Sequence, residues 1–262
     1  MRIGFIGAGN MTSAITKGAV DLGILSSKDI YIYDRNDYKT RELCEKYGFN
    51  ICRSQGEAEI KTDILVVAVK PANAKDVFSG ISKAKAVISI VAGYSYADIK
   101  GCVLKKDIRF LRIMPNTPLA VGEGLSAFAL PTDFTEEELN EARRIFGALG
   151  KVEEIDEKYF SAVTAVSGSG PAYVYMFIEA LADAGVKHVL KRDVALTLAA
   201  QTVYGSSKMV LETNIHPAIL KDAVTSPGGT TIEATSVLEK NCFRGAIIAA
   251  VDACVKKADN LK

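Results

Sequence analysis

The chain has 262 residues, of which 48% are hydrophobic, and its 32 basic and 31 acidic residues leave a net charge of +1. This length suits two domains, and the hydrophobic content excludes wholesale disorder. The charge balance gives no reason to expect nucleic acid or an anionic membrane as a partner, and no apolar run approaches the roughly 18 residues that span a bilayer.

The cysteines and histidines narrow the chemistry further. Five cysteines are scattered without a C-x-x-C pair, which is typical of reduced thiols in the cytoplasm. With only two histidines, we expect neither a metal site nor a Ser-His-Asp triad. The N-terminal apolar run meets glycines where a signal peptide would continue, so it is interpreted as a strand of a cytoplasmic protein.

Short apolar runs alternate with amphipathic stretches through the first part of the chain. The expected strands cover residues 2–6, 30–33, 63–69, 86–91, 108–114, 124–130 and 151–155. The expected helices between them cover residues 11–22, 38–47, 72–79 and 135–149. This alternation predicts βαβ units, and therefore a mostly parallel sheet with helices on both faces.

After about residue 156 the strand-like runs give way to helical periodicity. The segments PAYVYMFIEALADAGV and FRGAIIAAVDACVKKADNL are apolar over much of the helix circumference. Such helices predict a bundle whose surface is buried by a second subunit. We therefore expect a dinucleotide-binding Rossmann domain over residues 1–157 and a helical domain for dimerisation and substrate binding over residues 158–262.

The segment IGFIGAGNMTSAI places a glycine-rich turn between the first strand and the first helix. The first glycine permits a tight turn, the second lets the backbone approach a pyrophosphate, and the helix start offers free N–H groups. Thr12 stands where a third glycine is common, so the helix must pack there with a β-branched side chain. The residues expected to contact the dinucleotide are Gly7, Ala8, Gly9, Asn10 and Met11.

The end of the second expected strand carries opposing cues for the cofactor. Asp34 lies where an acid accepts hydrogen bonds from the adenosine ribose, which favours NADH. Arg35 could stack on adenine or pair with a 2′-phosphate, which favours NADPH. We keep both cofactors with a slight preference for NADPH, and the alternative for Arg35 is a solvated surface residue.

Two further segments follow strands at the edge of the sheet where ligands bind in open α/β folds. Val69, Lys70 and Pro71 end the strand over residues 63–69, which places Lys70 near the cofactor ribose or the substrate. Asn116 lies in a loop stiffened by two prolines and is a candidate substrate contact. An ordinary connecting loop is the alternative for each segment.

A break in the helical part, TSPGGTTIEA, has the composition of an anion site. Two glycines let the backbone come close to a ligand, hydroxyl groups can donate, and the following helix start favours negative charge. The segment therefore predicts a site for a small carboxylate, with a plain turn as the alternative. The candidate residues are Ser226, Gly228, Gly229, Thr230 and Thr231.

With these motifs in place, the whole chain resembles the pyrroline-5-carboxylate reductase family. The resemblance rests on GFIGAGNM, AVKP, MPNTP, SGSGPAYVYMFIEAL and, above all, LKDAVTSPGGTTIEA. It implies reduction of 1-pyrroline-5-carboxylate to L-proline by NADPH or NADH, the last step of proline biosynthesis. It also implies that the segment from Ser226 to Thr231 binds the substrate carboxylate, with Thr231 near the ring nitrogen. From its position at the end of a strand, Lys70 is kept as a second catalytic candidate beside Thr231.

The same resemblance implies an interlocked homodimer, with a ring of dimers such as a decamer as the larger assembly. Two other functions remain open on the residues alone. A β-hydroxyacid dehydrogenase would need an acid or base, typically a lysine in the first helix of the second domain, and the segment 171–186 has none. A non-catalytic nucleotide-binding regulator would keep the glycine turn but would not require the late Ser-Pro-Gly-Gly-Thr-Thr break.

Overall fold

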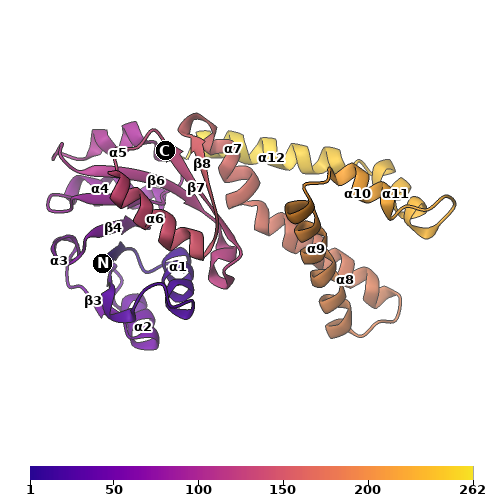
Figure 1. Cartoon of the computed structure of the whole chain (residues 1–262), viewed down its shortest axis with the longest axis horizontal. Helices are drawn as coiled ribbons and strands as arrows, with labels where there is room; N and C mark the ends of the chain where they lie inside the picture. The colour runs from indigo at the N-terminus through magenta and orange to yellow at the C-terminus, as the bar shows by residue number, and fades with distance from the viewer. Residues whose placement is uncertain (262) are drawn as a thin grey trace. The chain divides into compact units, whose positions relative to one another are not determined.

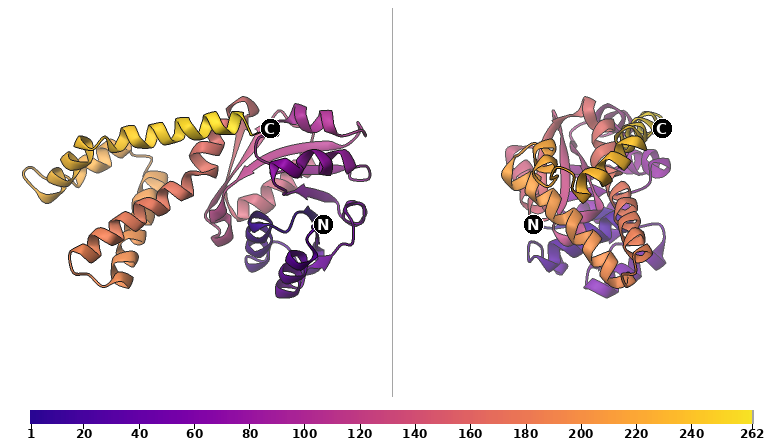
Figure 2. Two further views of the ribbon diagram at one scale, coloured as in Figure 1. Left: turned by 180° about the vertical axis from the view of Figure 1, so that it is seen from behind. Right: turned by 90° about the vertical axis from the view of Figure 1, so that its right-hand side faces the viewer.

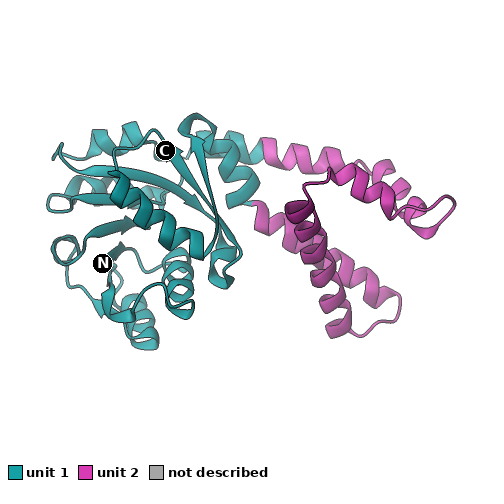
Figure 3. Ribbon diagram, viewed as in Figure 1, with its two compact units in different colours: residues 1–169, 253–262 teal, residues 170–252 magenta. Residues whose placement is uncertain are grey.

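The structure, a computed structural model, describes residues 1–261 and divides into two units. Unit 1 comprises Met1–Ser169 and Ala253–Lys262, and unit 2 comprises Gly170–Asp252 (Figure 3). This division lies later in the chain than the domain boundary expected after residue 157. The reason is local packing, because Phe160 is buried against Met114 on the sheet and belongs to unit 1.

Unit 1 is built on a sheet that has eight strands within the described residues, in the order β3-β2-β1-β4-β5-β6-β7-β8 (Figure 1). The strands are β1 (Ile3–Ile6), β2 (Ile30–Tyr33), β3 (Asn50–Ile51), β4 (Ile64–Val67), β5 (Ala86–Ser89), β6 (Arg109–Pro115), β7 (Gly124–Leu130) and β8 (Gly150–Asp156). Neighbouring strands are parallel, except that β6 and β7 are antiparallel. The predicted Rossmann-type sheet is confirmed, and its strand order reverses between β1 and β4.

Helices cover both faces of this sheet. They are α1 (Asn10–Asp21), α2 (Asp37–Tyr47), α3 (Gln55–Lys61), α4 (Pro71–Gly80), α5 (Tyr96–Cys102), α6 (Glu136–Ala148) and the short α7 (Phe160–Val163). One apolar core joins the sheet to α1, α2 and α6, and a second core joins it to α3, α4 and α5. Strands β1, β4 and β5 are buried on both faces, which is why they are apolar at consecutive positions.

The predicted elements of unit 1 are all present, with ends that differ by no more than one or two residues. Among the strands and α-helices before residue 156, three short elements were missed, namely β3, α3 and α5. Strand β3 has two residues and each helix has seven, which is too short for periodicity to reveal them. The caps at Ser54 and Ser95 were the available signals, since each hydroxyl accepts a hydrogen bond from the N–H three residues later.

Unit 2 is helical, as predicted. Its helices are α8 (Gly170–Lys187), α9 (Arg192–Thr213), α10 (Pro217–Ala223), α11 (Thr230–Lys240) and most of α12 (Phe243–Asp259). Helices α8 and α9 lie side by side in Figures 1 and 2 and pack through a cluster of small side chains that includes Ala182, Ala195 and Ala199. Within residues 1–261, none of the helices combines the length and apolar character needed to cross a membrane.

Candidate active site

The glycine-rich turn between β1 and α1 has the geometry expected of a dinucleotide cradle. Gly7 has φ +109°, and a Cβ there would lie 2.5 Å from the carbonyl oxygen of Ala68. A Cβ on Gly9 would meet no atom within 4 Å, so the backbone is open to an approaching ligand at this point. Helix α1 follows directly and has no side-chain cap, which leaves its first N–H groups for an anion such as a pyrophosphate.

Thr12 stands where a third glycine is common, and it contributes a hydrogen bond to the turn. Its side chain is completely buried, and Oγ1 donates a hydrogen bond of 2.6 Å to the carbonyl oxygen of Gly7. The hydroxyl therefore satisfies a buried backbone acceptor in the turn. The departure from the three-glycine pattern adds a tie between the first helix and the turn.

A cleft of about 340 Å³ opens at the carboxyl ends of β1, β2 and β4, and a second hollow of about 240 Å³ shares Gly9 and Lys39 with its lining. Predicted cofactor residues that line one or both are Gly7, Ala8, Gly9, Asn10, Asp34, Arg35, Val69 and Lys70. Met11 and Pro71 border neither of these two spaces. Met11 packs against the core, and Pro71 is the first residue of α4, so each supports the site's framework.

Asp34 ties the second strand to the glycine turn. Its Oδ2 accepts a hydrogen bond of 2.8 Å from the N–H of Ala8, and its Oδ1 accepts one of 2.8 Å from the N–H of Asn36. Each carboxylate oxygen has a second lone pair, so a ribose hydroxyl can still donate to it. The carboxylate thus shapes the turn in addition to the predicted ribose contact.

Two cations flank this cleft near the end of β2. Arg35 is exposed, and its Nη2 lies 3.6 Å from Asp76, a surface ion pair of little energetic weight. Lys39 lines both the cleft and the neighbouring hollow. Lys39 was not predicted from the sequence, because it reaches the cleft only where α2 packs beside the glycine turn.

The side chain of Asn116 is hydrogen-bonded to other residues of the protein. Its Oδ1 accepts a hydrogen bond of 2.8 Å from the N–H of Leu125, and its Nδ2 is 3.3 Å from both the carbonyl oxygen and the hydroxyl of Ser167. Both ends of the amide therefore bind protein groups. Asn116 joins the end of β6 to the π-helical turn Thr164–Gly168, and its substrate role stays a prediction.

The late loop belongs to unit 2 and has the local geometry of an anion site. Gly228 has φ +66°, and the N–H of Gly229 donates a hydrogen bond of 3.1 Å to the carbonyl oxygen of Ser226. Helix α11 then begins at Thr230 without a side-chain cap, so its first N–H groups are available, with Thr231 in the first turn. Whether this loop binds the substrate carboxylate stays a prediction.

Comparisons with known proteins match both halves of the chain. A model described as NADP oxidoreductase, coenzyme F420-dependent, matches residues 2–93, and one described as pyrroline-5-carboxylate reductase dimerisation matches residues 157–261. Pyrroline-5-carboxylate reductase of Arabidopsis thaliana is 43% identical to this chain, over 99% of this chain and 95% of that protein. The chain belongs to the pyrroline-5-carboxylate reductase family.

Other members of the pyrroline-5-carboxylate reductase family are also similar to this chain over its whole length. The Escherichia coli protein of that name is 42% identical, over 99% of this chain and 98% of its own length. A crystal structure of pyrroline carboxylate reductase from Plasmodium falciparum with NADP bound aligns with a TM-score of 0.90 and 34% identity, over 100% of this chain and 98% of that chain. The predicted family and its class, an NAD(P)H-dependent oxidoreductase, are confirmed, and the dimerisation model supports self-association.

Proposed function

We propose that this chain reduces 1-pyrroline-5-carboxylate to L-proline with NADPH or NADH, the last step of proline biosynthesis. The observation that carries the proposal is family membership over essentially the whole chain, at 43% identity to a named reductase. The open cradle at Gly7 and Gly9 independently fits a dinucleotide, since a Cβ at Gly7 would clash while the space at Gly9 is clear.

The residues of unit 1 would hold the cofactor by its phosphates and its adenosine ribose. The turn from Gly7 to Asn10 offers backbone N–H groups to the pyrophosphate, and Asp34 accepts from the ribose while it fixes the N–H of Ala8. Bound there, the reduced nicotinamide supplies the hydride for the C=N carbon. The protein's contribution is orientation and electrostatics, which favours reaction by holding the reacting groups in place.

The residues of the late loop would bind the substrate. The uncapped N–H groups at the start of α11 and the hydroxyls of Ser226 and Thr230 receive the carboxylate, where helix polarity favours an anion. The hydroxyl of Thr231, or a water molecule that it holds, donates a hydrogen bond to the imine nitrogen. Because a neutral hydroxyl is a weak acid, Thr231 positions the imine more than it protonates it, and Lys70 is the second candidate for that proton.

The charge around the cleft supports NADPH as the preferred cofactor. Arg35 and Lys39 both line the space at the end of β2, and the first turn of α2 follows Asn36 there. A 2′-phosphate carries negative charge that two nearby cations and a helix start stabilise, whereas NADH offers no such group.

The assembly is inferred from the family and from the exposed apolar surface of unit 2. We propose an interlocked dimer through unit 2, a ring of dimers such as a decamer as the larger form, and a cytoplasmic location. The exposed apolar residues of α8 and α9 support the dimer, because such surface is rarely left in water. The helical domain that folds with the partner is proposed to begin at residue 158.

A direct assay tests the reaction. The purified chain is mixed with 1-pyrroline-5-carboxylate and NADPH, and the loss of reduced-nicotinamide absorbance is followed together with the formation of proline by chromatography. We expect the two to change in equal amounts. Binding of NADPH without consumption would favour a non-catalytic regulator, and activity on a β-hydroxyacid with NADP⁺ but none on the imine would favour the dehydrogenase alternative.

A further inference from the structure

Arg112 is a buried arginine in the half of the sheet that lies beyond the glycine turn. Its side chain is only 8% exposed, and its guanidinium carbon lies 4.6 Å from the centre of the Phe160 ring. Nη1 donates a hydrogen bond of 2.9 Å to Oε1 of Glu157, but Nε has no partner among the described residues. A buried ion pair that is incompletely hydrogen-bonded contributes little to stability, which points to a role other than stabilising the fold.

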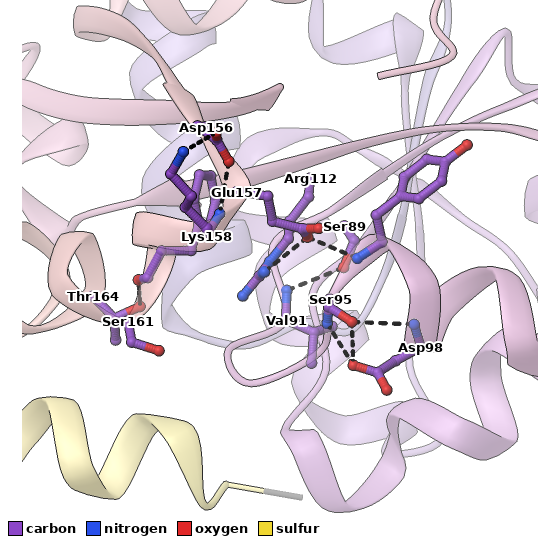
Figure 4. Close-up of polar contacts among 12 residues, drawn as sticks. Ser89, Val91, Ser95, Asp98, Arg112, Asp156, Glu157, Lys158, Ser161 and Thr164 are labelled. Atoms are coloured by element: carbon purple, nitrogen blue, oxygen red, sulfur yellow. Dashed lines mark hydrogen bonds and ion pairs between the residues drawn. The ribbon is translucent and has the colours of Figure 1, made fainter. Parts of the chain in front are cut away.

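The carboxylate that binds Arg112 also holds the start of α5. Oε1 of Glu157 accepts a second hydrogen bond, of 2.7 Å, from the N–H of Tyr96, the first residue of that helix. Figure 4 shows Glu157 beside Arg112. Glu157 follows β8 directly in the chain, and Arg112 lies on β6. One carboxylate oxygen therefore joins the middle of the sheet to the first turn of α5.

The Tyr96 side chain is anchored at its far end as well. Its Oη donates a hydrogen bond of 2.9 Å to Oδ2 of Asp133, and Nζ of Lys100 lies 2.6 Å from the same carboxylate oxygen. Burial, together with the hydrogen bond to Asp133, raises the pKa of Tyr96 to about 12, so the hydroxyl remains a donor. The beginning of α5 is thus fixed through both the backbone and the side chain of Tyr96.

The segment held in this way leads from the carboxyl end of β5 into α5, over residues 90–95. In a doubly wound sheet the two mononucleotide halves of a dinucleotide lie over the carboxyl ends of the two halves of the sheet. Strands β1 and β2 carry the glycine turn and Asp34, so the nicotinamide half falls to β4, β5 and β6. Gly93, with φ +78°, forms the turn in this segment.

The segment borders a cavity on the side of Arg112, where packing and hydrogen bonds together hold it. A cavity of about 460 Å³ is lined by Gly93, Ser95, Arg112 and Phe160, among others. The start of the segment is packed, since Val91 is 1% exposed in the second core and a Cβ on Gly93 would lie 2.7 Å from Cβ of Leu261. The hydrogen bond from Tyr96 to Glu157 therefore adds to this packing at the end of the segment that the cavity borders. The segment's hydrogen bonds include those of the N–H of Val91 to Ser89, at 3.4 Å, and of the Ser95 cap with Asp98 (Figure 4). The N–H of Ile90 also donates to the carbonyl oxygen of Val67 on β4, at 3.1 Å.

We propose that Arg112 and Glu157 are positioning residues for hydride transfer: through Tyr96 they hold the 90–95 segment against the nicotinamide half of the bound dinucleotide. This inference rests on the proposed reductase function. It assigns Arg112 an effect on the reacting end of the cofactor while leaving the adenosine end to the glycine turn.

The test compares the two ends of the cofactor in four variants. We expect Glu157→Ala and Arg112→Met to lower kcat about tenfold and to weaken NADPH binding several-fold, with unchanged affinity for ADP-ribose, which lacks the nicotinamide. Glu157→Gln keeps an oxygen for the N–H of Tyr96 and should recover most of the activity. Arg112→Lys should recover part of it, because a lysine has no planar fork.

A matched control is Arg143→Met, which removes an arginine of unit 1 that pairs with Glu136 and Glu154 on the surface of α6 and β8. This variant should match the wild type in kcat. Wild-type kcat and NADPH affinity in Glu157→Ala would overturn the inference, and so would losses that parallel ADP-ribose affinity or thermal stability. An inactive wild type would overturn the proposed reaction instead, and the ratio of NADPH to ADP-ribose affinity would still decide the positioning role.

Discussion

The two units differ in the size of the apolar side chains that they bury. Unit 1 completely buries large aromatic residues, among them Phe5, Phe78 and Phe128. Within residues 170–252, which the structure describes as unit 2, the buried hydrophobic residues are Ala182, Ala195 and Ala199. Met176 and Leu211 in the same unit are 70% and 67% exposed. Unit 1 therefore carries its own core, and unit 2 does not.

The difference shows where each unit obtains its stability. Full burial of one large aliphatic or aromatic side chain contributes about 1.5–3 kcal/mol, so a unit that buries only alanines gains little from its own chain. A second copy can supply the missing cover, which agrees with the dimerisation model that matches residues 157–261. Unit 1 is thus expected to set cofactor binding by itself, and unit 2 to depend on assembly.

The largest expected effect is on the glycine turn of unit 1. Gly7→Ala should weaken NADPH binding at least about 100-fold and lower the melting temperature, because backbone strain at positive φ and a clash cost on the order of 3 kcal/mol. A Cβ there would lie 2.5 Å from the carbonyl oxygen of Ala68. Gly9→Ala should keep the melting temperature yet weaken NADPH, since the space at Gly9 is open. Fluorescence titration and calorimetry separate the two, and wild-type NADPH affinity in Gly9→Ala would contradict the assignment.

The next effect tests the dependence of unit 2 on a second copy. The double variant Met176→Asp, Leu211→Asp should weaken self-association by about 30-fold or more, because burial of an unpaired carboxylate costs at least about 2 kcal/mol. Size-exclusion chromatography with light scattering measures the shift to monomer. The matched control is Leu104→Asp, since Leu104 is 86% exposed in unit 1. If the double variant and the control associate equally well, unit 2 does not depend on a second copy for cover of these residues.

The late loop links unit 2 to catalysis. Thr231→Ala should lower kcat about tenfold, the equivalent of one hydrogen bond of about 1.4 kcal/mol, without altering NADPH affinity. Steady-state kinetics and cofactor titration measure the two quantities. Thr235→Ala is the control, because Thr235 lies on the same helix and donates to the carbonyl oxygen of Ile232 at 3.1 Å. A fully active Thr231→Ala would dismiss the role of this hydroxyl.

An effect of similar size, confined to one of the two cofactors, is expected at the adenosine end of unit 1. Arg35→Glu and Lys39→Glu should each raise the KM for NADPH about tenfold and leave the KM for NADH nearly unchanged, because a repelled 2′-phosphate loses a charge-assisted contact. Arg41→Glu is the control, since Arg41 lies on α2 with Lys39 but does not line the cleft. Equal changes with both cofactors would show that neither cation reads the 2′-phosphate.

The smallest effect concerns the alkylation of cysteine thiols, which are buried in unit 1 at Cys44 and Cys52 and exposed in unit 2 at Cys242. Burial raises the pKa of both Cys44 and Cys52 to about 11, whereas Cys242 in unit 2 is exposed. At pH 8 only about one thiol in a thousand is ionised when the pKa is 11, so the buried pair should resist alkylation. Mass spectrometry after brief iodoacetamide treatment should find Cys242 modified first. Rapid alkylation of Cys44 would mean that unit 1 opens readily.

Local signals made much of unit 1 predictable. Strand β2 and strand β7 have the bounds expected from their apolar runs, and α6 begins where Thr135 and Glu138 form a capping box. The glycine turn was predicted because its chemistry depends on adjacent backbone positions. Strand β3 could not be predicted, since its two residues are ordered by pairing with β2 rather than by any pattern of their own.

Contacts between distant residues account for what was missed at the site. Lys39 reaches the cleft only because α2 packs beside the glycine turn. Asn116 meets Ser167, which is 51 residues later, and Arg112 meets Glu157, which is 45 residues later. No spacing in a single chain reveals such pairs, because they are created when strands and turns come together.

The sequence by itself determined the family, the order of strands and helices, and the two glycine-rich turns, because these depend on local backbone conformation and on motifs read in order. Only the tertiary structure decided which polar groups are already engaged within the protein: Asp34 by the N–H of Ala8, Asn116 by Ser167, and Glu157 by both Arg112 and Tyr96. The physical reason is that a buried polar atom takes whatever partner packing brings to it, and packing is a property of the whole fold.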